Sequence, residues 1–272
     1  MWWLQVKIIL SRKGFDSSNG GCASPIMPDG TLLSMPIPSN DRDRYSDLCW
    51  NDITYSELLS ELRPNKTYAG CHVDPDIRKN RVSAIDDWSP AFGQIGAAQG
   101  LLANAGVEAG DIFLFFGWFR HVEKTEKGYR YVRRKGDDFF AYADMNIIYG
   151  YMQVWEILTA PEKISQYHWH PHASEERSGK TNNALYLPTK TLSFAHSLKG
   201  CGTLDFRKDR VLTMEGKGRA TWNEYDFLMP EHIYGKKKNS AKNGGLYYSG
   251  IWQELVVYES DGLLDWVKNI LI

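Results

Sequence analysis

The 272-residue sequence has no apolar run approaching the 18 or more residues, roughly, of a membrane span. Its start, "MWWLQVKIIL", has no basic segment ahead of the apolar one, so it predicts no signal peptide. The four cysteines are widely spaced and form no CxxC pair, which argues against a cysteine zinc cluster. We therefore expect a cytoplasmic protein of a reducing compartment that does not contact membranes.

A large excess of positive charge is also missing. The formal net charge of −1 argues against binding nucleic acid through bulk positive charge. Two basic stretches, "YRYVRRK" over 129–135 and "GKKKNSAK" over 235–242, are candidates for a local patch, although a solvated charged face is the simpler explanation of both. The 10 Trp and 15 Tyr suit stacking on bases or sugars, although core filling is the simpler explanation.

Apolar and turn patterns predict more strands than helices. The expected strands cover 6–10, 107–120, 146–157, 182–188, 202–213 and 250–260. The expected helices cover 54–64, capped by Thr54 or Ser56, then 91–104, capped by Ser89, and 261–272. Without regular strand–helix alternation, these elements predict an α+β fold, with a mixed, largely antiparallel sheet or barrel and a few flanking helices. We find no internal repeat or linker and expect a single domain over 1–272.

The polar loop "SRKGFDSSNGG" over 11–21 follows the first predicted strand, where catalytic and anion-binding groups often lie. Arg12 and Lys13 suit a phosphate or carboxylate, and Asp16 with Ser17 suits a ribose, a metal or a base edge. The loop has neither the GxxxxGK[ST] nor the GxGxxG pattern, so no phosphate-loop or dinucleotide identity follows. A site and a simple turn both remain open.

"HVDPDIR" over 72–78 places two carboxylates close to a cation. Asp74 and Asp76 suit a shared divalent cation, or a division into acid and base if their pKa values differ. The alternative is a proline-stiffened turn in which the aspartates cap backbone amides and pair with Arg78.

"YHWHPHA" over 167–173 places His168, His170 and His172 at alternate positions, so an extended segment would present all three on one side. This pattern suits a metal or proton transfer, and the sequence does not separate the two. Downstream, Asn182 suits a base edge, a sugar or a turn. Gln253 and Glu254 suit support of a histidine or contact with a base amide.

Eight motifs in order resemble the third of the nucleotide modification associated domain families, over nearly the whole chain. They are "ILSRKGFDSSNGGCASPIMPDGTLLSMPIP", "HVDPDIR", "FGQIGAAQGLL", "GDIFLFFGWFR", "IIYGYMQVWEI", "HWHPHA", "NNALYLP" and "WQELVV". This resemblance implies association with bacterial and phage systems that alter nucleobases in DNA, without a settled reaction. Residues 107–160 are also similar to the strand pair of PUA-like barrels, such as ASCH and EVE domains, which often read modified bases.

Our first hypothesis is an enzyme that acts on a nucleobase or nucleotide, alone or within DNA, with partner proteins of a base-modification system. Its predicted catalytic residues are Asp16, Asp74, Asp76, His170 and His172. Its predicted substrate contacts are Ser11, Arg12, Lys13, Ser17, Arg78, Gln94, Trp118, Asn182, Gln253 and Glu254. The cofactor is unknown; for a divalent metal, the aspartates favour magnesium or manganese and the histidines favour zinc or iron.

The second hypothesis is a reader that binds an already modified base in an aromatic pocket. Trp118, Tyr149, Tyr151 or Trp169 would stack on that base, and the aspartates and histidines would serve as structural or hydrogen-bonding groups. A metal-dependent nuclease built on Asp74 and Asp76 is a third reading, but no acidic–lysine nuclease signature lies nearby.

Overall fold

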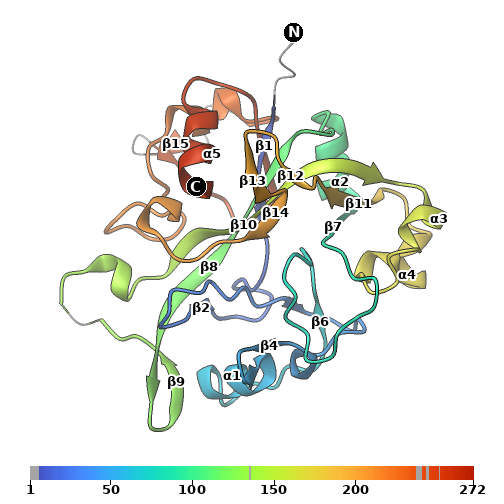
Figure 1. Cartoon of the computed structure of the whole chain (residues 1–272). Helices are drawn as coiled ribbons and strands as arrows, with labels where there is room; N and C mark the ends of the chain where they lie inside the picture. The colour runs from blue at the N-terminus through green and yellow to red at the C-terminus, as the bar shows by residue number, and fades with distance from the viewer. Residues whose placement is uncertain (1–5, 135, 237–240, 243–244, 251) are drawn as a thin grey trace.

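In the part of the chain that the structure describes, nine strands form one curled, mixed sheet (Figure 1). The structure is a computed structural model that describes residues 6–134, 136–236, 241–242, 245–250 and 252–272. The "MWWLQ" start, Lys135 of the first basic stretch and residues 237–240 of the second lie outside the described residues.

The sheet joins strands from the whole length of the chain. Its strands are β1 (Ile8–Arg12), β2 (Ser24–Ile26), β7 (Phe92–Ile95), β8 (Ile112–Thr125), β9 (Gly128–Tyr131), β10 (Met145–Leu158), β11 (Asn183–Pro188), β14 (Cys201–Thr203) and β17 (Glu254–Val257). The main order is β17-β1-β8-β10-β11-β7. β1 and β2 run parallel to β8, and the remaining pairs are antiparallel. The predicted α+β fold with a mixed, largely antiparallel sheet is confirmed.

The apolar run of β8 packs on both faces of the sheet. Successive side chains of a strand point to opposite faces, so Leu114 and Phe116 join one core while Phe113 and Phe115 join another. On the first face, Phe116 meets Trp222 edge to face, with ring centroids 5.1 Å apart. The continuous apolar pattern of this segment therefore reflects burial on both sides.

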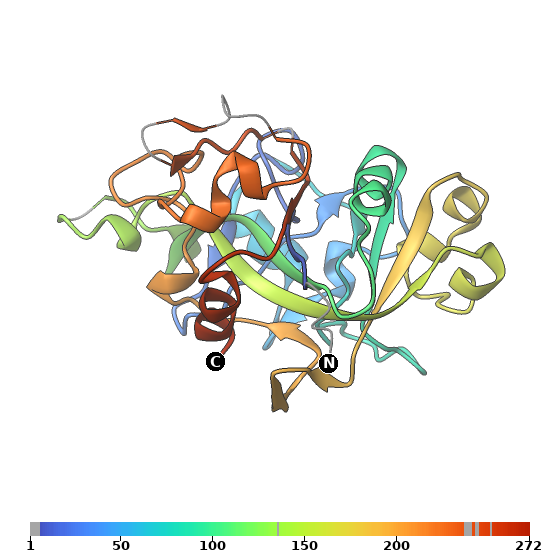
Figure 2. The same ribbon diagram turned by 90° about the horizontal axis from the view of Figure 1, so that it is seen from above.

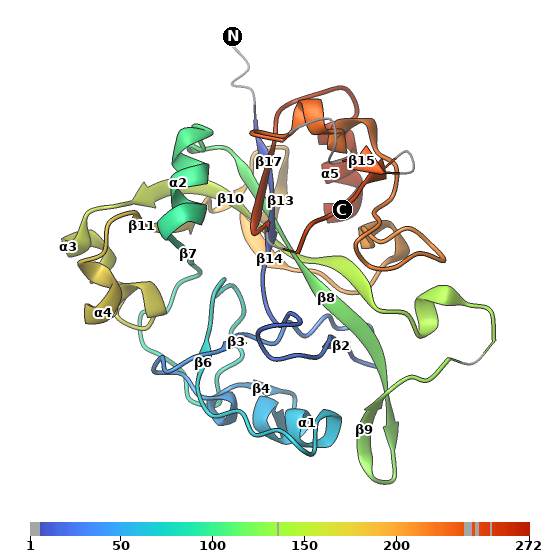
Figure 3. The ribbon, with the colours of Figure 1, turned by 180° about the vertical axis from the view of Figure 1, so that it is seen from behind.

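A smaller third core lies at one end of the molecule, around α1 (Tyr55–Leu62) (Figure 3). Around it lie the short strands β3 (Ile37–Pro38), β4 (Cys49–Trp50), β5 (Ile53–Thr54) and β6 (Cys71–His72). Thr54 caps α1 as predicted, because its Oγ1 accepts a hydrogen bond from the Glu57 amide at 3.2 Å while the Glu57 carboxylate accepts from the Thr54 amide at 2.8 Å.

The remaining elements surround the long strands β8 and β10. They are α2 (Gly96–Asn104), α3 (Pro161–Ile164), α4 (Glu175–Ser178), β12 (Thr191–Leu192), β13 (Ala195–Lys199), β15 (Ala241–Lys242), β16 (Gly245–Leu246) and α5 (Leu263–Leu271). Seen from above, α3 and α4 lie on one side and α5 on the other (Figure 2). The predicted closing helix is confirmed as α5. Across the described ranges, no helix combines the length and the apolar character that crossing a membrane requires.

Two predicted elements have wrong bounds. The helix expected over 91–104 begins only at Gly96, because Phe92–Ile95 forms β7 and pairs with β11. Phe92 is fully buried against aromatic rings of β8 and β11, and this packing outweighs the local signal of a proline at a helix start. The strand expected over 202–213 stops after Thr203, and a 3-10 turn at Lys208–Arg210 follows.

A pair of tryptophans tests this packing. Trp222 is fully buried and stacks on Tyr248 with ring centroids 4.7 Å apart, whereas Trp155 is 61% exposed. We expect Trp222→Ala to lower the free energy of unfolding by about 3–5 kcal/mol, through lost apolar contact and the cavity it leaves. Trp155→Ala should change it by less than about 0.5 kcal/mol. Urea unfolding followed by circular dichroism measures both, and equal losses would contradict the described core.

Candidate functional site

A cavity of about 400 Å³, called the main cavity below, opens between the 11–21 loop, β6, β7 and the histidine segment. Its polar lining residues are Arg12, Lys13, Asp16, Asn19, Ser39, His72, Asp74, Gln94, His172, Arg177 and Gln253. This volume lies within the range of about 300–1,000 Å³ that is usual for small-molecule sites. The predicted motifs of the first loop, of "HVDPDIR" and of the histidine segment therefore meet at one place.

Two histidines of the main cavity have fixed orientations. His72 Nδ1 lies 2.7 Å from Asp41 Oδ2, and His172 Nδ1 lies 2.7 Å from Asn183 Oδ1. The Asn183 amide group donates in turn to the His172 carbonyl at 3.0 Å, which fixes which end of the amide faces the ring. Since both partners of the Nδ1 atoms are acceptors, each neutral ring carries its proton on Nδ1 and its lone pair on Nε2.

Asp74 lies between these rings and a third histidine. Its Oδ1 accepts the Gly93 amide at 2.7 Å and lies 3.3 Å from His170 Nε2. His170 Nδ1 accepts the His172 amide at 3.2 Å, so the His170 proton sits on Nε2, toward Asp74. Burial favours the neutral acid, but the close polar contact with His170 and the charge of Lys13 outweigh it and hold the pKa of Asp74 below its usual value.

The environment of His172 keeps its ring neutral. Burial is the largest effect and, with His170 and His72 nearby, lowers the pKa of His172 to about 3 despite the attraction of Asp74. An ionised carboxylate and a neutral imidazole therefore line one wall of the main cavity near neutral pH. His72 Nε2 lies 3.9 Å from the second oxygen of Asp74, Oδ2, on the same wall.

Asp41 and Arg177 support this wall, and Arg177 is itself one of the residues that line the cavity. Arg177 donates to both oxygens of Asp41 and, at 3.1 Å, to the Pro171 carbonyl. Burial opposes ionisation of Asp41, but hydrogen bonds from His72, Arg177 and Ser39 prevail and lower its pKa. Sequence reasoning did not place His72, Asp41 or Arg177 at the site. His72 lay within a quoted motif, whereas Asp41 and Arg177 look like ordinary surface charges in "NDRDR" and "EERSG".

Asp16 lines the main cavity but also holds its own loop together. Its Oδ1 accepts the amides of Ser18 and Asn19 at 2.7 and 2.6 Å, and Arg12 pairs with its Oδ2. Burial raises the pKa of Asp16, but these hydrogen bonds outweigh it and lower the value overall. Gln253 also lines the cavity, and its carbonyl accepts the Arg12 amide at 2.8 Å.

Glu254 is buried behind the main cavity. Its Oε1 accepts hydrogen bonds from Ser11 Oγ at 2.9 Å, Lys13 Nζ at 3.1 Å and Gln94 Nε2 at 2.6 Å. Burial raises the pKa of Glu254, and Lys13 and the hydrogen bonds oppose that change. Lys13 and Gln94 line the main cavity, whereas Ser11 and Glu254 are not among its lining residues.

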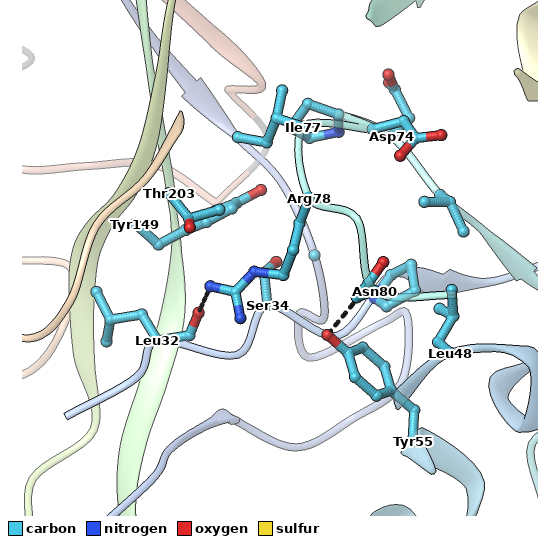
Figure 4. A pocket seen from close by; sticks show the side chains of 15 residues that line it. Leu32, Ser34, Leu48, Tyr55, Asp74, Ile77, Arg78, Asn80, Tyr149 and Thr203 are labelled. Carbon is cyan, nitrogen blue, oxygen red and sulfur yellow. Dashed lines mark hydrogen bonds between the residues drawn. The ribbon is translucent and has the colours of Figure 1, made fainter. Parts of the chain in front are cut away.

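Asp76 and Arg78 lie away from the main cavity, contrary to their predicted roles. The Asp76 carboxylate is taken up by Arg81 at 2.9 Å and by Trp88 Nε1 at 3.0 Å. Figure 4 shows the Arg78 side chain directed toward Leu32, whose carbonyl it reaches at 3.3 Å, and away from Asp74. Arg78 lines a cavity of about 50 Å³ that shares Gly14 and Asp74 with the main cavity and is too small for a nucleotide.

The histidine segment is not extended. A turn leads into a 3-10 helix at Pro171–Ala173, so alternate positions do not share one side. His168 is exposed and does not line the main cavity, whereas His170 and His172 are buried. Asn182 is likewise exposed at a turn, and its neighbour Asn183 makes the contact to His172. The proline that starts the turn accounts for the wrong prediction.

A second cavity of about 420 Å³, called the Trp118 cavity below, adjoins the main cavity and shares Arg12, Asp16 and Asn19 with it. The Arg219 guanidinium lies 3.9 Å from the centre of the Trp118 ring, and Arg219 donates to Ser17 Oγ. Trp118 and Ser17 both line this cavity, and their contact with a substrate stays a prediction. The other predicted stacking residues, Tyr149, Tyr151 and Trp169, are buried.

One of three comparisons with known proteins gives a match, and that match covers most of the chain. Neither the curated proteins nor the solved structures give a match. The antiparallel pairing of β8 with β10 is present, but the likeness of 107–160 to PUA-like barrels is not shown by these comparisons and stays a prediction. The model of one family, nucleotide modification associated domain 3, matches residues 7–257. The chain, with its main cavity built from the motifs of the resemblance, therefore belongs to the nucleotide modification associated domain 3 family.

Proposed function

We propose that the chain is an enzyme that modifies a nucleobase or a nucleotide, alone or within DNA, and that the reaction takes place in the main cavity. Family membership supports a role in nucleotide modification. The observation that supports catalysis is the convergence of Asp74, His72 and His172 on one wall, with both ring orientations fixed. A neutral imidazole beside an ionised carboxylate is a combination suited to moving a proton.

In this proposal the predicted catalytic residues fall into three groups. Asp74 and His172 remain catalytic, joined by His72, because their free atoms face the main cavity. His170 becomes a positioning residue, since it is 1% exposed and acts on Asp74. Asp16 becomes a positioning residue of the loop and of Arg12. Asp76 is left out, because Arg81 and Trp88 occupy its carboxylate.

Substrate binding in this proposal uses groups that keep unused donors. Lys13 uses one of its three N–H groups for the hydrogen bond to Glu254, so the other two can donate to a phosphate or a carbonyl oxygen. Gln94 and Gln253 add amide groups to the same wall. Since Arg12 lines both cavities, a nucleotide or a DNA strand bound along the 11–21 loop would contact both. Partner proteins of a base-modification system remain part of the proposal.

The alternative function is a reader of a modified base, seated in the Trp118 cavity. The observation in its favour is the Trp118 ring itself, flanked by Arg219 and by the Asp16 and Ser17 end of the loop. Fewer aromatic side chains are available for stacking than the sequence suggests, because Tyr149, Tyr151 and Trp169 are buried. A reader also gives no reason for the ordered histidines of the main cavity.

The enzyme proposal predicts a new nucleoside in cells that express the chain. Mass spectrometry of nucleosides digested from DNA, from RNA and from the free nucleotide pool should find it with the wild type and with His168→Gln, whose histidine is exposed. His172→Gln should lower its amount by about 100-fold or more, as expected for loss of a proton-transferring group. Equal amounts from His172→Gln and wild type would contradict the catalytic role of His172.

A glycine tests the close approach of His172 to β7. A Cβ atom at Gly93 would lie 2.3 Å from the His172 ring, whereas one at Gly100 would have ordinary contacts. We expect Gly93→Ala to displace the ring and reduce nucleoside formation at least tenfold, and Gly100→Ala to leave it unchanged. The His172 ring resonances in nitrogen–proton spectra should shift in the first variant alone. Unaltered resonances in Gly93→Ala would show that the ring does not lie against β7.

The Trp118 cavity separates the two functions. Stacking of a base on an aromatic ring contributes about 1–3 kcal/mol, so Trp118→Ala should raise KM by roughly 5- to 150-fold while Trp118→Phe stays near wild type. In the enzyme, kcat should change less than KM. Three results together would instead support the reader. The wild type would bind oligonucleotides with a modified base, Trp118→Ala would lose this binding, and the wild type would form no new nucleoside.

A further inference from the structure

We propose that the main cavity binds one divalent first-row transition metal ion through His72 Nε2, His172 Nε2 and Asp74 Oδ2. This inference rests on the proposed function and changes one part of it: the ion would activate a substrate or a water, and His72, His172 and Asp74 would hold the ion instead of moving a proton themselves. The three side chains offer ligand atoms that all lie within 4.8 Å of one another. They come from β6, from the turn after it and from the 3-10 helix of the histidine segment.

The free atoms of these residues point to a common ligand. Among the described residues, neither His72 Nε2 nor His172 Nε2 makes a hydrogen bond, because each ring uses Nδ1 for its protein partner. Asp74 likewise uses Oδ1 for the Gly93 amide and for His170, which leaves Oδ2. Each of the three proposed ligand atoms therefore keeps a lone pair with which it can bind an ion.

The proposed ligand atoms would have to move only slightly closer together to bind one ion. Ligand bonds of about 2.1 Å place two atoms bound to one ion roughly 3–4 Å apart. His72 Nε2 and Asp74 Oδ2, at 3.9 Å, already meet that spacing. The largest separation in the group, at most 4.8 Å, would close by about 1–2 Å on binding.

Each proposed ligand has an outer partner that fixes its direction. Asp41 holds His72, Asn183 holds His172, and His170 with the Gly93 amide holds Asp74. Histidine ligands in metalloproteins usually donate their second ring N–H to such a carboxylate or carbonyl oxygen. Asp41 is itself held by Arg177 and Ser39, so the orientation extends into the surrounding structure.

The ligand types favour transition metals over magnesium or calcium. Two imidazoles and one carboxylate suit iron, zinc and similar ions, whereas magnesium and calcium prefer oxygen ligands throughout. Three protein ligands leave coordination positions open toward the cavity, as catalytic sites require. The cations around the cavity are each paired with an acid, Arg12 with Asp16, Lys13 with Glu254 and Arg177 with Asp41, which offsets their repulsion of a bound dication.

Metal titration tests this inference without any substrate. Untagged chain is treated with a chelator, dialysed and titrated with Zn²⁺, and with Fe²⁺ under nitrogen, in a calorimeter. We expect one ion per chain, with affinity lowered at least 100-fold in His72→Ala, His172→Gln and Asp74→Asn. Asp41→Asn, which keeps its size, should weaken binding by about 10- to 100-fold through His72. The exposed histidines give the controls His168→Ala and His196→Ala, which should bind as the wild type does.

Several results would overturn the inference. One is wild-type affinity in His72→Ala or Asp74→Asn, and another is a loss of binding in the two controls that equals the loss in the ligand variants. Circular dichroism and thermal unfolding check that each variant is folded. If an Ala variant is unfolded, the metal affinity of Asp41→Asn still tests the inference. A chain that forms its new nucleoside with full activity in excess chelator would refute the metal but support the proposed function. A chain that binds the ion as expected yet forms no new nucleoside would do the reverse.

Discussion

The buried carboxylate of Glu254 ties the two ends of the sheet together. β17, which carries it, and β7, which carries Gln94, are the outermost strands of the main order, yet Gln94 Nε2 lies 2.6 Å from Glu254 Oε1. That contact exists only because the sheet curls. Ser11 and Lys13 donate to the same oxygen, so the loop after β1 starts from this point as well. A buried, paired carboxylate is costly to disturb, since removing a partner leaves a charge without compensation.

The ion pairs around the main cavity order its walls more than they charge it. Arg12, Lys13 and Arg177 each face a carboxylate, so the positive potential that reaches a ligand is reduced. This agrees with the net charge of −1 and with recognition through placed donors instead of a broad attractive field. A nucleotide would be selected by the few groups that remain free and by the size of the cavity.

Local sequence patterns predicted what local forces determine. The capping of α1, the apolar strands β8 and β10 and the closing helix α5 depend on neighbours within a few residues, and the sequence shows them. The wall of the site depends on distant partners. Asp41 meets His72 across 31 positions and Arg177 across 136 positions, so no spacing in the sequence identifies them. The alternate histidines suggested one shared face, and the turn at Pro171 separated His168 from the others.

The first residues of the predicted helix, Phe92–Ile95, form a strand because the site and the sheet both require it there. Successive residues of a strand point to opposite sides, so β7 presents Gly93 to the His172 ring and Gln94 to Glu254. A side chain at position 93 would overlap the ring, and a helical turn would redirect the Gly93 amide away from Asp74. The glycine that weakens a helix by its flexibility is thus the residue that allows one strand to contact two buried carboxylates, Asp74 and Glu254. Local preference fails at this point because tertiary contacts on both sides of β7 outweigh it.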